Sequence, residues 1–185
     1  NQTKVRDLNA WDFGYLILYC VKLFENNSDI KKIYKKNFRY ILVDEFQDTN
    51  FIQNKWLNLL VNEKQNICCV GDDDQSIYSW RGAEIKNFLT FDHIYKNCKV
   101  FKLEQNYRST KNILETASTL ISHNKGRVEK KLWSSAQQGE KVKLNCYQTG
   151  REEAENISDI AENKLKKKYS LNNVAILVRA IYQTR

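Results

Sequence analysis

Hydrophobic residues recur at intervals of three and four along several stretches of the chain, which is the spacing of one face of an α-helix. The first such stretch begins at Phe13, and two more lie over 52–60 and 113–121. The segment 151–168 also has an apolar face, and its acidic residues precede its lysines, an order that stabilises the helix dipole. The pattern therefore predicts a helix in each of these segments.

Short continuous runs of apolar residues predict strands. The runs 39–43 and 66–70 end abruptly in polar residues, which is typical of strands buried on both faces of a parallel sheet. Because the predicted helix over 52–60 lies between them, the order strand, helix, strand indicates a crossover unit. Further strands are expected over 100–103 and 174–178.

Two segments of the second half of the chain differ from these apolar runs. Residues 142–146 alternate between apolar and polar, as a half-exposed strand does, whereas residues 125–139 are polar and are expected to form a loop. Strands that alternate with helices predict an α/β fold with a parallel sheet.

The composition narrows the class of protein. With 185 residues and 42% hydrophobic content the chain can bury a core, which excludes a disordered tail and a disulfide-stapled miniprotein. Its longest apolar stretch, 13–21, is about half of the roughly 20 residues that a membrane-spanning helix needs, so we expect no membrane contact. The five cysteines include no CxxC pair and the two histidines lie far from them, which disfavours zinc sites and disulfides and favours a reducing compartment such as the cytoplasm.

The charge of the chain adds a candidate partner. Lys and Arg outnumber Asp and Glu by 30 to 22, a net charge of +8, and basic chains of this size often bind a polyanion such as nucleic acid. A lysine-rich genome would explain the same excess, and the charge alone does not separate the two explanations. Because the sequence contains no methionine, we expect it to be a fragment of a longer protein.

Two adjacent acids, Asp44 and Glu45, follow the first predicted strand. Ligands of open α/β sheets bind beyond the carboxyl ends of the strands, so these acids are candidate catalytic residues. An aspartate there can hold Mg²⁺, which keeps most of its water shell and takes one or two carboxylates, and a glutamate can deprotonate an attacking water. The alternative is a pair of solvated acids at the start of a loop.

Three longer strings carry a resemblance to a known family. The strings are ILVDEFQDTN at 41–50, VGDDDQSIYSWRGA at 70–83 and LEQNYRST at 103–110. In this order they resemble the Walker B motif, the motif that couples nucleotide to DNA, and the entry to the second domain of the UvrD/PcrA/Rep-type DNA helicases. The resemblance covers most of 12–185 and departs at 12–16, where the family usually has a DFDDL-like stretch and this chain has DFGYL.

This resemblance implies RecA-like parallel sheets flanked by helices, with incomplete parts of two tandem RecA-like domains. Residues 1–104 would form the C-terminal part of the first RecA-like ATPase domain, and residues 105–185 the N-terminal part of the second. A complete motor of this kind needs a Walker A loop, GxxxxGKS or GxxxxGKT, which is absent from this sequence. We therefore expect the isolated 185 residues to hydrolyse ATP at no useful rate.

The same resemblance assigns roles around ATP. Asp44 would bind Mg²⁺, Glu45 would activate the water that attacks the γ-phosphate, and Gln75 would sense that phosphate through an uncharged amide. Arg108 would be the arginine finger from the second domain, and Tyr107 would stack on the adenine. A structural Tyr-Arg pair at the entrance of a helix is the alternative for the last two.

The candidate DNA-binding residues are Tyr78, Trp80 and Arg81, which follow the sensor glutamine. Aromatic faces stack on any base and so bind single strands without reading sequence, although burial in a core is the alternative for a tryptophan. Arg179 and Arg185 resemble arginines of a second-domain motif, and contact with backbone phosphates and simple solvation are equally open for them.

The resemblance implies a fragment of an ATP-dependent 3′-to-5′ DNA helicase that acts on single-stranded DNA and duplex junctions in repair or replication, with ATP, Mg²⁺ and flanking segments of the same protein. ATP would close the two RecA-like domains and shift the strand path. Gln47 and Asp48 would either take part in this coupling or satisfy hydrogen bonds of their loop. The alternatives are a non-catalytic DNA-binding remnant of a split or decayed gene and a helicase-nuclease subunit.

Overall fold

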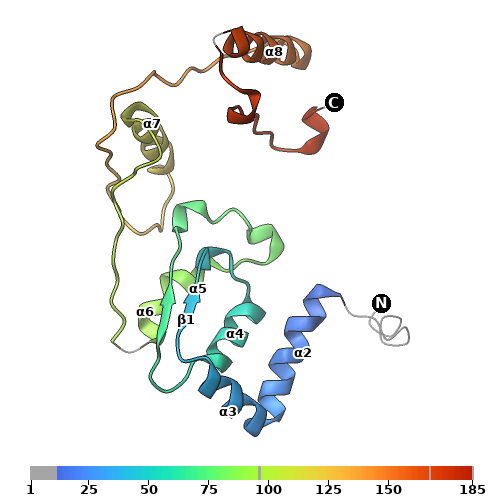
Figure 1. Cartoon of the computed structure of the whole chain (residues 1–185), viewed down its shortest axis with the longest axis vertical. Coiled ribbons are helices and arrows are strands. Elements are labelled where there is room, and N and C mark those ends of the chain that lie inside the picture. Colours follow the sequence, from blue (N-terminus) through green and yellow to red (C-terminus); the bar gives the residue numbers. More distant parts are fainter. Residues whose placement is uncertain (1–11, 96, 167, 185) are drawn as a thin grey trace. The chain divides into compact units, whose positions relative to one another are not determined.

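The computed structural model describes residues 12–95, 97–166 and 168–184, and the chain divides into two compact units, Asn1–Gly139 and Glu140–Arg185 (Figure 1). The first unit contains a small parallel sheet with helices packed around it, and the second contains one long helix. The α/β class with a parallel sheet, which was predicted from the sequence, is thereby confirmed.

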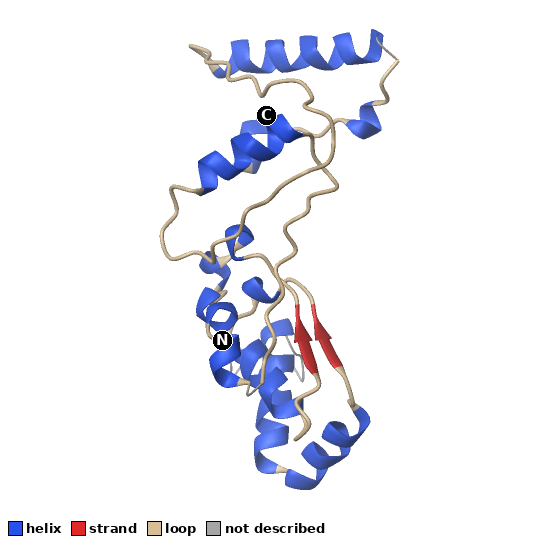
Figure 2. Cartoon of the chain, turned by 90° about the vertical axis from the view of Figure 1, so that its left-hand side faces the viewer, coloured by secondary structure: helices blue, strands red, loops and turns tan. Residues whose placement is uncertain are grey.

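Within the described residues the sheet has two parallel strands, β1 (Ile41–Val43) and β2 (Ile67–Cys69), which lie side by side in Figure 2. Their register aligns the last residue of β1 with the last residue of β2, so both strands end at the same edge of the sheet. Helix α4 (Phe51–Leu60) lies between them in the chain, which confirms the predicted strand, helix, strand unit.

Helices α2 (Phe13–Asn26), α3 (Ser28–Asn37) and α4 pack against one another in the first unit. Val21 and Phe24 on α2 and Leu57 on α4 are among the buried residues of the core. These residues belong to the apolar faces that the spacing of three and four predicted, so burial of one face stabilises α2 and α4. Helix α3 was not predicted and has no buried residue.

The loop between β1 and α4 is compact. It contains a 3₁₀ turn, η1 (Phe46–Asp48), whose buried Phe46 ring meets the Phe91 ring edge-on at 5.5 Å between centroids. It ends in a capping box, in which the Asn50 side chain accepts from the Gln53 amide and the Gln53 side chain accepts from the Asn50 amide, both at 2.9 Å. The residues that follow β1 are therefore held at both ends.

The segment after β2 contains two further 3₁₀ turns, η2 (Asp73–Gln75) and η3 (Ser79–Arg81), and then the short helices α5 (Ile85–Leu89) and α6 (Phe91–Ile94). Helix α5 packs against both η1 and η2. It thereby holds the loops that follow β1 and β2 next to each other.

Residues 100–103 form no strand, so this prediction is wrong. An apolar run becomes a strand only where another strand offers its hydrogen-bonding groups, and among the described residues the run 100–103 has no such neighbour. A single parallel bridge joins Gln105 to Trp133 just beyond the run. Helix α7 (Lys111–Ile121) follows as predicted, and residues 125–139 form the predicted loop.

The second unit is formed around α8 (Gly150–Lys166), which confirms the predicted helix, with the turns η4 (Leu171–Asn173) and η5 (Ile181–Thr184). The predicted strands over 142–146 and 174–178 are wrong, because both segments are exposed and pair with no strand among the described residues. The apolar patterns of these two segments show that their side chains suit a sheet. A strand also needs a neighbouring strand with which to form hydrogen bonds, and the pattern does not provide one.

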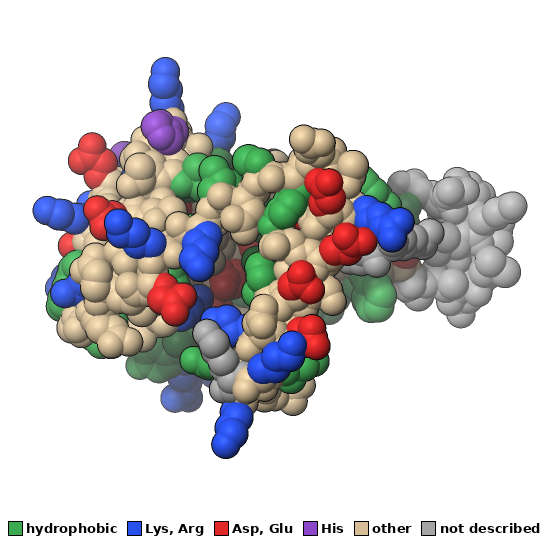
Figure 3. Space-filling view, turned by 90° about the horizontal axis from the view of Figure 1, so that it is seen from above, with side chains coloured by type: hydrophobic (Ala, Val, Ile, Leu, Met, Phe, Trp, Pro, Cys, Tyr) green, Lys and Arg blue, Asp and Glu red, His purple; other side chains and the backbone are tan. Residues whose placement is uncertain are grey.

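None of the helices in the described ranges combines the length and apolar character needed to cross a membrane. On the face drawn in Figure 3, lysine and arginine side chains are interspersed with acidic ones and do not gather in one patch.

Candidate active site

The two acids lie where β1 ends, and both are exposed to solvent. The backbone of Glu45 is left-handed, with φ 49° and ψ 43°, which is an uncommon conformation for a residue other than glycine and costs of order 1–3 kcal/mol. The Glu45 amide donates to Asp44 Oδ1 at 2.9 Å. This turn leaves both carboxylates accessible to a ligand at the carboxyl edge of the sheet.

The side chain of Gln47 bridges the ends of the two strands and is 1% exposed. Its Nε2 donates to Glu45 Oε2 at 2.7 Å, and its Oε1 accepts from the backbone amide of Asp72 at 3.1 Å. One buried amide therefore holds both the glutamate after β1 and the backbone after β2. These bonds satisfy the loop and also join the two segments, so a coupling role for Gln47 stays a prediction.

The same set of hydrogen bonds reaches Gln75, the predicted phosphate sensor. Gln75 Nε2 donates to Asp72 Oδ2 at 2.7 Å, and its side chain is at the surface. Glu45, Gln47, Asp72 and Gln75 thus form a continuous set, which we call the relay. The structure brings Glu45 and Gln75 to the same edge of the sheet, although they are far apart in the sequence.

Gly71 makes the central contact of the relay possible. A Cβ at this position would lie 2.5 Å from Gln47 Oε1 and 2.9 Å from the Phe88 ring. We expect Gly71→Ala to displace Gln47 and to destabilise the first unit by about 1–3 kcal/mol, the usual cost of overpacking. Thermal unfolding of the chain measures this. Gly150→Ala is the control, because no atom lies within 4 Å of its added Cβ, and equal midpoints for the two variants would contradict the prediction.

The three candidate DNA-binding residues lie together at η3, which contains Trp80 and Arg81 and is preceded by Tyr78. The Arg81 guanidinium lies 4.6 Å from the Trp80 ring centroid and 5.0 Å from that of Tyr78, and the two rings are 6.4 Å apart. Trp80 is 71% exposed, so the alternative of a core tryptophan does not hold for this residue. The residues therefore present an aromatic and cationic surface to solvent.

The loop that carries these residues, 72–83, is attached to the segment after β1 at both ends. At its start Gln47 holds the Asp72 amide, and at its end Asn50 and Ala83 form an antiparallel bridge. We call this segment the coupling loop. Both ends of the coupling loop are therefore held to the segment after β1.

Tyr107 and Arg108 are exposed, and the turn that carries them is ordered by Asn106, whose Oδ1 accepts from the amides of Arg108 at 3.0 Å and Ser109 at 2.8 Å. The Tyr107 hydroxyl donates to Gln105 at 2.7 Å. In the described part of the chain the Arg108 guanidinium forms no ion pair, and the structure does not bring it into contact with the relay.

Of the two arginines near the C-terminus for which phosphate contact was considered, the structure describes one. Arg179 is exposed in the second unit, where solvation and phosphate contact both remain open to it. Arg185 lies outside the described residues.

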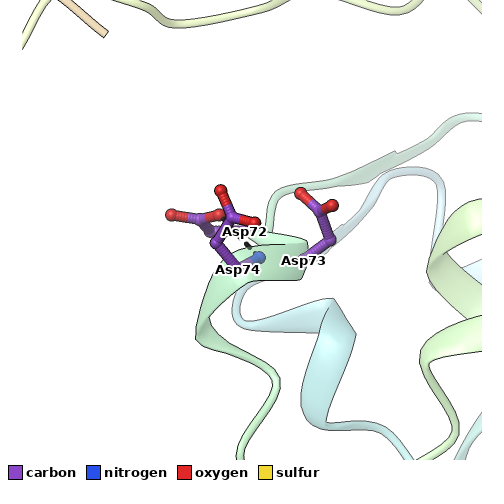
Figure 4. A group of neighbouring side chains, drawn as sticks. All are labelled: Asp72, Asp73 and Asp74. Carbon is purple, nitrogen blue, oxygen red and sulfur yellow. Dashed lines mark hydrogen bonds between the residues drawn. The ribbon is translucent and has the colours of Figure 1, made fainter. Parts of the chain in front are cut away.

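Sequence reasoning missed two basic residues of the 125–139 loop. Arg127 and Lys130, which we call the basic clamp, contact Asp72, Asp73 and Asp74, the aspartate cluster. Figure 4 shows the three carboxylates projecting to one side of the η2 turn. A signal for this contact does exist in the sequence, where a run of acids in one polar segment is matched by a run of basic residues in another.

The clamp and the cluster are closely bonded. The Lys130 ammonium bonds to Asp72, to Asp73 at 2.8 Å and to Asp74 at 3.0 Å, and the Arg127 guanidinium holds Asp74 with bonds of 2.8 and 2.5 Å. The backbone amide of Val128 also donates to Asp73 at 2.7 Å. The Arg127 and Lys130 side chains are thus bonded to the aspartates of the coupling loop.

The pKa values reflect this pairing. Burial raises the pKa of Asp72, but hydrogen bonds from Lys130 and Gln75 outweigh burial and hold the pKa below its usual value. The Arg127 hydrogen bond is the largest influence on Asp74 and lowers its pKa. Burial disfavours the charged form of Lys130, yet its bonds to the aspartates raise the pKa of the ammonium. Both partners therefore carry charge at neutral pH.

Two places could hold a cation. The aspartate cluster has carboxylate oxygens within 4.8 Å of one another, but the Lys130 ammonium contacts all three carboxylates and balances part of their charge. Asp44 is a single exposed carboxylate at the strand end, and its Oδ1 already accepts from the Glu45 amide. Its exposure fits Mg²⁺, which keeps several waters and takes one or two carboxylates.

Known proteins match this chain in both halves. The family profile of the UvrD/REP helicase N-terminal domain matches residues 1–96, and that of the UvrD-like helicase C-terminal domain matches residues 101–185. DNA helicase II of Rickettsia typhi is 49% identical over 178 residues, which are 96% of this chain. ATP-dependent DNA helicase PcrA of Staphylococcus epidermidis is 46% identical over 178 residues, or 95% of this chain. DNA helicase II of Escherichia coli K12 is 42% identical over 174 residues, or 94% of this chain.

The chain spans 27% of the length of the first of these relatives and 24% of the length of the other two. The N-terminal profile alone covers more than half of the 185 residues, and the C-terminal profile follows it in the order expected of one continuous polypeptide. The chain therefore belongs to the UvrD/REP helicase family.

Proposed function

We propose that this chain is a fragment of an ATP-dependent DNA helicase that moves in the 3′-to-5′ direction on single-stranded DNA and unwinds duplex junctions in repair or replication. The observation that supports this most directly is the relay, which joins Glu45 to Gln75 at the carboxyl edge of two parallel strands. Ligands of open α/β sheets bind at this edge. The direction of movement and the pathway are inferred from the family.

In this proposal Asp44 holds Mg²⁺, which supplies positive charge to the phosphates of ATP. Glu45 accepts a proton from the attacking water, a step for which its exposed carboxylate is suited. The buried amide of Gln47 donates to Glu45 Oε2 and so restricts that carboxylate to one orientation. Gln75 offers an amide that can donate to a phosphate oxygen or accept from water.

The coupling loop would connect this chemistry to DNA. Gln75 lies near the start of the loop and Trp80 near its end, and hydrogen bonds hold both ends to the segment after β1. In the proposal the exposed Trp80 ring stacks on a base, and Arg81 contributes positive charge beside it. A shift of Gln75 on hydrolysis would move this surface relative to the strand.

Trp80→Ala tests the proposal in the complete protein. Because one stacked base contributes roughly 1–3 kcal/mol, we expect binding of single-stranded DNA to weaken about 5- to 150-fold, with DNA-stimulated ATPase reduced more than basal ATPase. Fluorescence anisotropy with a labelled oligonucleotide and a coupled ATPase assay measure the two effects.

The matched control is Ile77→Ala, which removes an exposed apolar side chain from the same loop without removing a ring. An equal loss of basal and stimulated ATPase in Trp80→Ala would contradict a role of Trp80 in stacking on DNA. A complete wild-type protein that binds DNA but shows no DNA-stimulated ATP hydrolysis would instead favour the non-catalytic remnant.

A further inference from the structure

The basic clamp joins segments that are 53 to 58 residues apart in the chain. The aspartate cluster lies in the region matched by the N-terminal family profile, and the clamp lies in the region matched by the C-terminal one. Both belong to the same compact unit of the structure. The contact therefore ties the coupling loop to a part of the chain that belongs to the other family domain.

The clamp is more than a surface ion pair. The side chains of Asp73, Asp74 and Lys130 are only 5%, 12% and 14% exposed, so solvent screens their attraction little. Removing one partner of such a buried set leaves an uncompensated charge, which makes the arrangement sensitive to a single substitution.

Asp72 connects the clamp to the predicted phosphate sensor. Its Oδ1 accepts from Lys130 and, at 3.1 Å, from the backbone amide of Asp74, its Oδ2 accepts from Gln75, and its backbone amide donates to Gln47. The carboxylate is thus held by two residues of its own turn, Asp74 and Gln75, and by Lys130 from a distant segment. Loss of the Lys130 bond leaves only the bonds within the turn, so we expect the carboxylate to shift and to displace the acceptor that orients the Gln75 amide.

We propose that Lys130, assisted by Arg127, is a positioning residue that sets the orientation of the Gln75 side chain through Asp72. The orientation of Gln75 thereby depends on the position of the 127–130 segment. This inference rests on the proposed function, since Gln75 has a reaction to serve only in a nucleotide-hydrolysing enzyme. Movement of the C-terminal family domain would shift the clamp and change the orientation of Gln75. The second domain would thereby influence the sensor through the clamp, in addition to any contact that Tyr107 and Arg108 make with the nucleotide.

The first test uses the 185-residue chain and needs no ATPase activity. Lys130→Met removes the charge and keeps most of the side-chain length, and Lys131→Met is the control because Lys131 is exposed and its contact is made by its backbone amide. We expect Lys130→Met alone to accelerate hydrogen exchange at the amides of 72–76. Unchanged exchange in this variant would overturn the proposal, whatever the complete protein does.

The second test uses the complete protein. Because a displacement of about 1 Å can cost about 100-fold in rate, we expect Lys130→Met to lower DNA-stimulated kcat about 10- to 100-fold while the KM for ATP and the affinity for single-stranded DNA stay close to wild type. Lys130→Arg keeps the charge and should recover most of kcat. A parallel fall in DNA affinity, or no recovery with arginine, would show that the clamp only maintains the fold.

Two comparisons keep this result interpretable. If Lys130→Met fails to fold, Arg127→Gln removes the more exposed half of the clamp, and it should lower kcat in the same sense by a smaller factor. Glu45→Gln is measured beside it. If Glu45→Gln loses activity and Lys130→Met keeps the wild-type kcat, the positioning role of the clamp is overturned and the proposed function is not. If the wild-type protein shows no ATPase activity, the proposed function itself is contradicted.

Discussion

Arg108→Ala in the complete protein is expected to lower DNA-stimulated ATP hydrolysis by roughly 1,000- to 100,000-fold, the range attributed to arginine fingers in phosphoryl transfer. The guanidinium is exposed and, among the described residues, forms no ion pair that would have to break before it reached a phosphate. Its backbone, in contrast, is held by Asn106 through a 3.0 Å bond. An ordered backbone with a free side chain is suited to a group that acts only when a cleft closes.

The measurement is steady-state ATPase at saturating DNA, with nucleotide affinity measured separately by a fluorescent ATP analogue. Arg108→Lys should recover little, because a point charge does not reproduce the planar fork of donors. Arg151→Ala is the control, since Arg151 is also exposed but pairs with Glu155 on α8. A loss in Arg108→Ala no greater than that in Arg151→Ala would remove Arg108 from the reaction.

Glu45→Gln should retain nucleotide and lower hydrolysis by roughly 100- to 10,000-fold, the usual contribution of a general base. Glutamine matches glutamate in shape and still offers an oxygen to Gln47 Nε2, which donates to Glu45 Oε2 in the native protein. The relay and the left-handed turn should therefore persist while the proton acceptor is lost. This variant separates loss of chemistry from loss of structure.

Single-turnover hydrolysis and equilibrium nucleotide binding test this prediction. Glu63→Gln is a suitable control, because Glu63 is an exposed acid after α4 that the relay does not use. Wild-type turnover in Glu45→Gln would show that another group activates the water. A loss of nucleotide binding as large as the loss of turnover would indicate a binding role for Glu45 instead.

Helices were predictable because the interactions that reveal them lie within a few turns of chain. The apolar faces of α2, α4, α7 and α8 repeat at three and four residues, so their positions follow from the local pattern. The pair β1 and β2 was predictable for a related reason, since two apolar runs separated by a helix form a crossover unit.

The strands expected over 100–103, 142–146 and 174–178 show where this reasoning ends. Each run has the side chains of a strand, but a strand exists only when a neighbour accepts and donates its backbone hydrogen bonds. A sequence pattern describes one segment and carries no statement about its neighbour. These three predictions therefore needed information that the segments themselves do not contain.

The sequence by itself determined the helices α2, α4, α7 and α8, the strand, helix, strand unit, the adjacent acids at a strand end and the resemblance that assigned roles to Glu45, Gln75 and Arg108, whereas α3, α5 and α6 were not predicted. Only the tertiary structure decided that Gln47 links Glu45 to Asp72 and that Lys130 holds the aspartate cluster. The physical reason is that a hydrogen bond or ion pair depends on distance in space and not on distance along the chain. Gln47 and Asp72 are 25 residues apart in the sequence, and Asp72 and Lys130 are 58 residues apart.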